Sequence, residues 1–461
     1  MSRSPARVFA ALNAERPADQ ASPVLGKAVV LGGSVAGLLA ARVLSAYAES
    51  VVVIDRDDLH VAGDRPGVPQ GTQLHALLPG GLHQLENLFP GFRERALARG
   101  AVGAPPAARR NYLDGRLKVV VPDDADSLAG TRPLLEGLIR EQVLRLPNVK
   151  TMRARATGLV VDGAVTTGVR YDVGGAPGVE CGDLVVDAMG RSSRLSEWLE
   201  QAGWERPATR RMTVNLNYAT ALFRRREPDP EFTVVLALNS PGTPAEVAGA
   251  AFFAVEDGRW MAMMAGYGDS RPGRTPEDFV RRLREAFPPE FGEVAGSELV
   301  GDVRTYRHAD SRRRDFAALK RFPAGLVSVG DAVASFNPVY GQGMTAAALH
   351  AACLSSYLRS GPDLGAPARR FFELQKVVVD AAWSMSTSAD LALPHVAGPY
   401  PRGYRLSRWV SRQIVAATVT DVPVARRFND VVSMREHPRA LASPGVLLGA
   451  VRANRRARRR R

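Results

Sequence analysis

Near its N-terminus the chain carries a glycine-rich segment with the spacing that phosphate binding requires. Residues 32–37 read GGSVAG, which matches the pattern G-x-G-x-x-G with Gly32 and Gly37 in place and Ser34 at the second glycine. Gly32 would permit a tight turn after a strand, and Gly37 would let the next helix pack closely on that strand. Free N–H groups at the N-terminus of this helix would then point at a pyrophosphate, and the Ser34 hydroxyl would be a further donor.

The elements that must position this turn are expected on either side of it. The sequence predicts an apolar strand over residues 27–32, a helix over 36–47 and a second buried strand over 50–55. Asp55 ends the second strand about 18 residues after Gly37, where a carboxylate accepts hydrogen bonds from ribose hydroxyls. The segment therefore predicts a βαβ unit that binds the ADP half of a dinucleotide cofactor.

A second segment, residues 325–344, distinguishes between the dinucleotides. Its sequence GLVSVGDAVASFNPVYGQGM begins with a buried strand that delivers Asp331 at its carboxyl end, where the side chain could bind a polyhydroxy chain such as ribityl. Pro338, Gly341 and Gly343 then precede a helix expected over residues 343–358, whose first amides can face the carbonyls of a flavin. This combination favours FAD over NAD.

A third segment extends the pattern to a known family. Residues 187–194 read DAMGRSSR, in the form D-x-x-G-R-x-S. In this order the three segments resemble those of FAD-dependent monooxygenases of the aromatic-hydroxylase (group A) type. The resemblance implies an α/β fold, with a Rossmann-like FAD-binding domain, an inserted antiparallel β-sheet substrate domain and a helical C-terminus. It also implies that NAD(P)H binds transiently, which agrees with the absence of a second glycine fingerprint.

Further residues resemble one subgroup of this family. Residues 65–81 (RPGVPQGTQLHALLPGG), the run NPVYGQGM at 337–344, and Asp380 to Trp383 with Asp390 downstream are similar to bacterial olefin epoxidases that act on polyether polyketide precursors. Those enzymes are distantly related to squalene epoxidases. The similarity runs from about residue 27 to about residue 444. One departure is TQL at residues 72–74, where this subgroup has Arg-His-Ala; His75 matches only the second of the two expected histidines.

The resemblance also suggests roles for single residues, each beside a simpler alternative. Arg132 matches the family's flavin-contacting arginine, or is a surface arginine at the start of a helix. Arg65 lies beside the flavin and contacts FAD or NAD(P)H, or is a plain loop arginine. His75 lines the flavin or is a core histidine, and Trp383 is expected in the core. With Pro338, Arg65 and His75 are the candidates that line the flavin; no catalytic residue and no metal ligand is predicted. The residues predicted to bind FAD are Gly32, Gly33, Ser34, Gly37, Asp55, Arg56, Arg65, Arg132, Asp187, Gly190, Gly330, Asp331, Pro338, Gly341, Gln342, Gly343 and Met344.

The family implies a reaction that uses FAD, NAD(P)H and O₂. A flavin C4a-hydroperoxide would epoxidise an alkene of a polyketide or terpenoid intermediate in bacterial secondary metabolism, such as antibiotic biosynthesis. The alternatives are hydroxylation of an aromatic or polyketide ring, prenyl reduction and a non-redox flavoprotein cyclase. A flavin halogenase is disfavoured because the chain lacks Trp-x-Trp-x-Ile-Pro and has no lysine between Lys27 and Lys118. The apolar and aromatic residues of 212–266 are compatible with a small hydrophobic olefinic or aromatic substrate.

Composition limits the class of protein. The 461 residues are 45% apolar and 23% charged, as in soluble globular proteins, and no apolar run is long enough to span a bilayer. Two distant cysteines exclude a disulfide framework and favour the cytoplasm. Seven of the last ten residues are arginine, which supply half of the net charge of +14. This tail, Arg452 to Arg461, is expected to be solvated, with weak contact to anionic surfaces and no specific nucleic-acid partner.

These observations predict a division of the chain into five parts. A flexible leader is expected over 1–25, and a helical C-terminal region and a basic tail over 361–444 and 445–461. The FAD-binding domain is assigned to 26–75, 123–205 and 301–360. The substrate domain is assigned to 76–122 and 206–300, with strands over 213–223, 232–238, 251–255 and 260–265.

Overall fold

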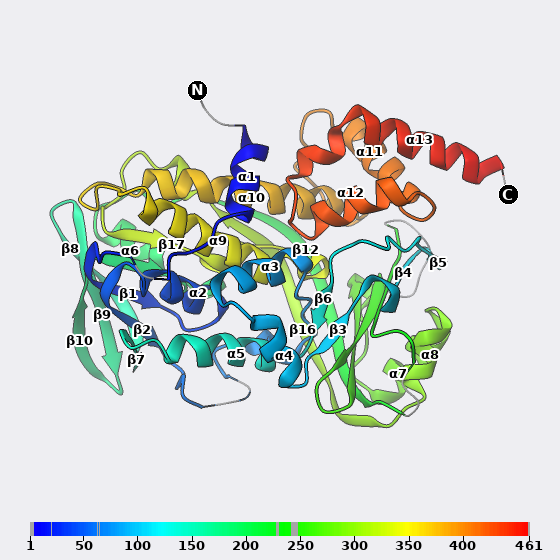
Figure 1. Ribbon diagram of the computed structural model, residues 1–461, viewed down its shortest axis with the longest axis horizontal. Helices are drawn as coiled ribbons and strands as arrows, with labels where there is room; N and C mark the ends of the chain where they lie inside the picture. Colours follow the sequence, from blue (N-terminus) through cyan, green and yellow to red (C-terminus); the bar gives the residue numbers. More distant parts are fainter. Residues whose placement is uncertain are drawn as a thin grey trace.

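A five-stranded parallel sheet carries the predicted βαβ unit (Figure 1). The computed structural model describes residues 4–19, 21–61, 63, 65–226, 230–240 and 248–459. The strand order is β17-β11-β1-β2-β7, with every neighbouring pair parallel. The strands are β1 Leu25–Leu31, β2 Ala48–Asp55, β7 Val149–Arg153, β11 Leu184–Asp187 and β17 Leu326–Ser328.

Helices and a smaller sheet cover these strands, which explains their continuous apolar sequences. Helix α2 (Val35–Leu44) contacts both α5 (Arg132–Leu144) and α9 (Gly343–Arg359), and α10 (Arg369–Asp390) packs on α9. An antiparallel sheet of β8 (Arg155–Asp162), β9 (Val165–Val173) and β10 (Ala176–Cys181) contacts β2, β11 and β1. The predicted α/β class, with its strand–helix–strand unit, is confirmed.

A second large sheet extends from this α/β part. Its order is β18-β16-β12-β15-β14-β13-β4-β5, antiparallel except where β4 pairs with β13. The predicted strands of residues 213–265 lie in its centre, and β4 and β5 come from the earlier segment 76–122. The strands are β4 Arg109–Leu113, β5 Arg116–Leu117, β12 Thr209–Arg224, β13 Val234–Leu238, β14 Gly249–Val255, β15 Arg259–Tyr267, β16 Leu299–Arg314 and β18 Ala334–Ser335.

The two ends of strand β12, in the middle of this sheet, belong to different apolar clusters. Helices α7 (Pro276–Glu285) and α8 (Pro289–Ala295) bury Phe279 and Phe291 against an apolar cluster that includes Phe223. Leu216 and Tyr218 of β12 instead cluster with Leu391 and Val396, which follow α10. Strand β18 lies two residues after the turn at Asp331, so the sheet begins beside the predicted flavin segment.

The N-terminal segment differs from the expected flexible leader. Residues Pro5–Asn13 form helix α1, which contacts α9 and α10. Phe9 and Leu12 are buried in the main core, and the Glu15 carboxylate accepts a hydrogen bond from Ser355 Oγ at 2.8 Å. Val8 and Ala18 are partly buried against the same core.

The C-terminal region is helical, as predicted. Helices α11 (Tyr404–Ala417), α12 (Val422–Val432) and α13 (Pro444–Arg459) form a group with its own small core, at the upper right of Figure 1. The basic tail is helical as far as Arg459, since α13 includes it, and its described arginines are exposed, as expected of a solvated tail; Arg460 and Arg461 lie outside the described residues. None of the described helices combines the length and apolarity needed to cross a bilayer. The other helices and strands are α3 Pro79–Leu88, α4 Phe92–Ala98, β3 Val102–Ala104, β6 Ser127–Ala129 and α6 Leu195–Gln201.

Candidate cofactor site

The glycine turn has the geometry that its sequence predicts. Gly32 follows β1 with φ +103°, and a Cβ there would lie 2.5 Å from the carbonyl oxygen of Ala188. A Cβ on Gly37 would lie 1.7 Å from the carbonyl oxygen of Gly32. Ser34 is the N-cap of α2, but its side chain makes no capping hydrogen bond. The first amides of α2 therefore have no side chain of their own helix in front of them, as an anion site at a helix N-terminus requires.

Asp55 lies directly beside this turn. Its Oδ2 accepts a hydrogen bond from the backbone N–H of Gly33 at 2.6 Å, and its Oδ1 accepts one from the N–H of Asp57 at 2.8 Å. The same Oδ1 is 2.9 Å from Nη2 of Arg65. The predicted ribose ligand is thus placed at the end of β2 next to the phosphate turn, and its contact with a ribose stays a prediction.

Arg65 belongs to a buried ion cluster and is not a plain loop arginine. Its side chain is 6% exposed and pairs with Asp55, with Asp57 at 3.3 Å and with Glu136 at 2.7 Å. Its Nη1 also donates to the carbonyl oxygen of Gly33 at 2.7 Å. Burial alone would lower the pKa of Arg65, but the carboxylates of Asp55 and Glu136 raise it above its ordinary value. Arg65 therefore fixes its own part of the loop after β2 against the glycine turn.

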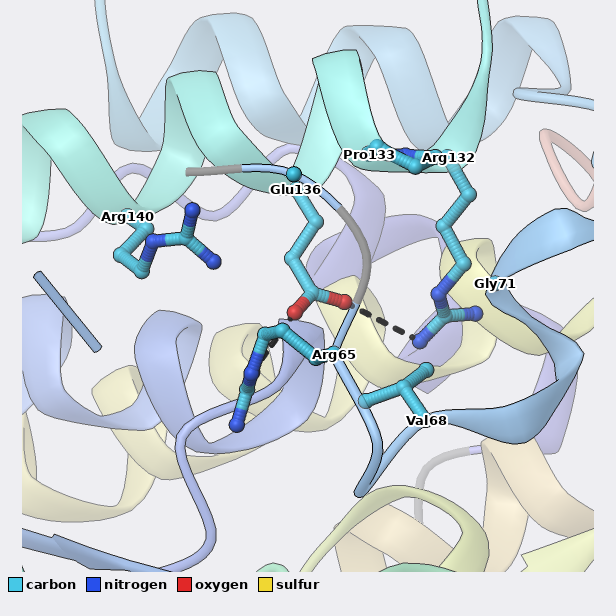
Figure 2. A pocket seen from close by; sticks show the side chains of 8 residues that line it. Arg65, Val68, Gly71, Arg132, Pro133, Glu136 and Arg140 are labelled. Atoms are coloured by element: carbon cyan, nitrogen blue, oxygen red, sulfur yellow. Dashed lines mark hydrogen bonds and ion pairs between the residues drawn. The ribbon is translucent and has the colours of Figure 1, made fainter. Parts of the chain in front are cut away.

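Glu136 is a site residue that the sequence did not single out. Its side chain is 5% exposed, and it accepts hydrogen bonds from Ser34 Oγ at 2.8 Å and from Arg65. Figure 2 shows its carboxylate between Arg65 and Arg132, with Arg140 further along α5. The sequence could have indicated Glu136 through its position four residues after Arg132, because residues four apart share a helix face.

Arg132 points inward, which rules out the surface alternative. It is the first residue of α5, its side chain is 12% exposed, and Nη2 lies 3.0 Å from Ser34 Oγ and 3.3 Å from Glu136. Its Nε is buried without a hydrogen-bond partner. Arg132 therefore presents an unsatisfied donor beside the glycine turn, as expected of a residue that binds an anionic group.

The G-D turn meets the glycine turn. Gly330 has φ +62°, and a Cβ there would lie 2.5 Å from the Cβ of Ala36 in the first turn of α2. Its N–H donates to Nδ1 of His350 at 2.9 Å, and burial lowers the pKa of His350 to about 3, so this imidazole is a neutral acceptor. Asp331 comes next. Burial raises the pKa of Asp331, while Arg191, Arg132 and Arg314 lower it in part.

The N-terminus of α9 opens onto space. Gln342 is its N-cap, and a Cβ on Gly343 would meet no atom within 4 Å. Gln342 Oε1 and Thr345 Oγ1 are both buried without a partner. Gly341 has φ +66°, and a Cβ there would lie 3.3 Å from the Cβ of Ala76, so the segment after His75 lies against this loop.

Asp390 fixes the loop that precedes α9. Its Oδ1 accepts hydrogen bonds from Asn337 Nδ2 at 2.7 Å and from the Tyr340 hydroxyl at 3.0 Å. Asn337 Oδ1 in turn accepts from the N–H of Val339 at 3.1 Å, which caps the turn that starts at Pro338. Burial raises the pKa of Asp390 to about 6, against these hydrogen bonds, which lower it.

In the D-G segment, the carboxylate of Asp187 is hydrogen-bonded within the chain. Asp187 is fully buried at the end of β11 and accepts hydrogen bonds from Ser193 Oγ at 2.7 Å, Ser328 Oγ at 3.0 Å and the N–H of Met189 at 3.1 Å. Burial raises the pKa of this carboxyl. Its partners belong to the chain itself, and the contact of Asp187 with a cofactor stays a prediction.

Arg191 connects this segment to the large sheet. After Gly190, which has φ +68°, its guanidinium donates to Ser335 Oγ at 2.5 Å, to Asp310 at 3.0 Å and to His308 Nδ1 at 3.4 Å. Burial and the nearby Arg191 lower the pKa of His308 to about 3. The sequence did not point to this cluster, because Arg191 and His308 are 117 residues apart.

The other residues singled out in the sequence are His75, Arg56, Met344 and Trp383, and they lie in different surroundings. His75 is placed near Arg132: its Nδ1 is 2.8 Å from the carbonyl oxygen of Gln73, and burial together with Arg132 lowers its pKa to about 3. Arg56 is exposed and donates to the carbonyl oxygen of Gly67 at 3.1 Å. Met344 and Trp383 pack against the main core, which agrees with the expectation for Trp383.

Comparisons with known proteins were made by sequence and by fold. No protein-family model matches the chain. Protein Rv3254 of Mycobacterium tuberculosis (strain ATCC 25618 / H37Rv) is 32% identical over 425 residues, which cover 87% of this chain and 88% of that protein.

Among solved structures, the flavin-dependent brominase Bmp2 is 15% identical, with a TM-score of 0.64 over 93% of this chain and 99% of that one. The p-nitrophenol 4-monooxygenase PnpA from Pseudomonas putida DLL-E4 is 18% identical, with a TM-score of 0.62 over 89% and 98%. PqsL, described as a probable FAD-dependent monooxygenase from Pseudomonas aeruginosa, is 18% identical, with a TM-score of 0.60 over 79% and 97%. At these identities the likeness establishes the fold alone.

Proposed function

The chain belongs to the same family as Protein Rv3254, and we propose that it is an FAD-dependent monooxygenase. One observation carries this proposal: the G-D turn approaches the first turn of α2, with Gly330 against Ala36. This contact supports a single site to which the N-termini of two helices, α2 and α9, contribute. A cofactor with a pyrophosphate in its middle and a flavin at one end needs such a pair of anion- and carbonyl-binding termini.

The residues present fit FAD. Asp55 lies beside the glycine turn, where the adenosine ribose would bind, and the open space in front of Gly343 would receive the flavin. Buried polar atoms without partners, namely Arg132 Nε, Gln342 Oε1 and Thr345 Oγ1, lie on the elements that border this space. Native proteins rarely leave such atoms unsatisfied, so they support a polar ligand here.

When bound, FAD would supply the oxygen chemistry, with NAD(P)H and O₂ as co-substrates. The chain would supply position and a dry site. Asp390, through Asn337, fixes the loop at the α9 N-terminus, and Arg191 fixes β18, the edge strand of the large sheet, to the D-G segment. Precise placement of this kind is the main contribution a protein makes to an oxygen transfer that needs no enzymic base.

We further propose that the substrate is an alkene of a polyketide or terpenoid intermediate. Hydroxylation of a phenol, the alternative, profits from a base near neutral pKa. Burial lowers the pKa of His75, near Arg132, and of His308, near Arg191, to about 3, so neither imidazole is such a base. Asp390 has a pKa raised to about 6, but its carboxylate already accepts hydrogen bonds from Asn337 and Tyr340. Together with the apolar side chains of β12 and β15 that face residues 391–396, this supports an epoxidase. A cytoplasmic location also stays a proposal.

The test uses the full chain with added FAD. We expect the purified protein to bind FAD and turn yellow, and to oxidise NAD(P)H with gain of one oxygen atom on polyene probes. Phenol probes should gain none. A chain that leaves FAD free in solution would refute the whole proposal, whereas oxygen gain on phenols alone would refute only epoxidation.

A further inference from the structure

The C-terminal helical group exposes large apolar side chains on one short segment. Leu406 is 67% exposed, Tyr400 53% and Trp409 47%, and all three lie within ten residues. Residues 405–409 of α11 are exposed without interruption, so the first turns of this helix project from the body of the protein. Its C-terminal half is anchored through Ile414 and Ala417 in the small core that α13 shares, and Tyr404 at its start packs against the apolar cluster that contains Leu391.

The same segment is strongly basic. Arg402, Arg405, Arg408 and Arg412 are all exposed, and residues 399–420 contain no aspartate or glutamate. None of these four arginines takes part in an ion pair within the described part of the chain. Other exposed arginines in that part do pair with an acidic residue, as Arg426 does with Asp123 and Arg206 with Glu200.

The aromatic rings border a surface hollow. Tyr400 and Tyr404 lie with their ring centroids 4.9 Å apart, and Arg405 and Arg408 line the same hollow. Exposed leucine, tryptophan and tyrosine together with arginine are the composition of helices that lie in a bilayer interface. The aromatic rings suit the headgroup level, and the arginine stems can extend along the apolar surface while their charges meet anionic lipid.

We propose that this surface, formed by Tyr400, Leu406, Trp409 and the arginines at 402, 405, 408 and 412, docks the protein on anionic lipid bilayers. The positive charge of this surface favours an anionic membrane over a second copy of the chain. A second copy of the chain would bring four like charges against four, whereas an anionic membrane attracts them. Figure 1 places α11 and α13 at the edge of the molecule, away from α5 and the glycine turn, so docking leaves the predicted cofactor site open. This inference does not depend on the proposed monooxygenase activity.

Vesicle flotation with the full chain tests the proposal. We expect the protein to float with vesicles of phosphatidylcholine and phosphatidylglycerol, not with phosphatidylcholine alone, and to dissociate at high salt. The double variant Leu406→Ser with Trp409→Ser should bind at least tenfold more weakly. A matched control, Val173→Ser with Val179→Ser, removes two exposed apolar residues from β9 and β10, 47% and 52% exposed, and should bind like the original chain. Circular dichroism should show that both variants are folded.

Three results would overturn the proposal. The first is the absence of flotation with anionic vesicles. The second is unchanged flotation of the Leu406 and Trp409 variant. The third is loss of flotation only in Arg455→Gln with Arg458→Gln, two exposed arginines of α13, since this would identify the basic C-terminal helix as the docking element instead.

Discussion

Replacing Gly37 with alanine should destabilise the chain and weaken its binding of FAD, although alanine is the better helix former. In a helix interior this change gains about 1 kcal/mol from propensity. In α2, however, the new Cβ would lie 1.7 Å from the carbonyl oxygen of Gly32, where ordinary contacts begin at 3.4 Å. Helix and turn must therefore separate by about 1.7 Å, the difference of these two distances.

The cost of this separation exceeds the gain in propensity. Overpacking costs about 1–3 kcal/mol, and a backbone oxygen cannot rotate away, so the upper end applies and the net loss is about 2 kcal/mol. The shift also moves the first amides of α2 away from Asp55 and the G-D turn. We therefore expect FAD to bind at least tenfold more weakly.

The chain offers a matched control in α5. Gly137 is also helical, but a Cβ there would meet no atom within 4 Å, so Gly137→Ala should be neutral or stabilising by up to about 1 kcal/mol. Urea unfolding of both variants without FAD, followed by titration with FAD, separates the two effects. A Gly37→Ala variant that is as stable as Gly137→Ala and binds FAD equally well would refute the predicted clash at the glycine turn.

Three further predictions concern buried carboxylates of the site. Asp390 has a pKa raised from 3.8 to about 6, so its ionisation costs the folded state about 3 kcal/mol as pH rises from 4 to 6. In urea unfolding, Asp390→Asn should remove this part of the pH dependence of stability. An unchanged pH dependence would contradict the raised pKa of Asp390. Glu136→Gln removes a charge shared by Arg65 and Arg132 and should destabilise the protein by about 1–3 kcal/mol. The control Glu141→Gln, in a more exposed ion pair on the same helix, should change stability by less than about 0.5 kcal/mol. Equal effects of the two variants in thermal unfolding would be inconsistent with the buried cluster. Asp331→Ala should lower FAD affinity by about tenfold to a hundredfold through loss of a charge-assisted hydrogen bond, and full flavin occupancy of this variant would disprove its role.

Much of the α/β part could be predicted because its determinants are local. Apolar runs before Gly32 and Asp55, with a helix between them, specify two parallel strands and a crossover whatever the rest of the chain does. The steric need for glycine at position 37 was likewise encoded in the spacing of the turn. The G-D segment could be found for the same reason, since a strand, an acid and a helix start follow one another directly.

The contacts between segments could not be predicted in this way. Glu136 becomes a site residue only when Arg65, from a loop 71 residues earlier, folds against it. Asp187 was predicted to bind the cofactor from its motif, but its environment is set by Ser328, 141 residues away. Helix α1 depends on the surface of α9 and α10 that receives Phe9 and Leu12, so its own sequence carries little indication of order.

The central claim is that this chain uses FAD to transfer one atom of O₂ to a substrate. The most direct measurement is mass spectrometry of products formed by the FAD-loaded chain with NAD(P)H and isotopically labelled O₂. We expect one labelled oxygen atom in the product of an alkene probe, and none when FAD or NAD(P)H is left out. Oxidation of NAD(P)H with label in no product, or an unlabelled oxygen in the product, would contradict it.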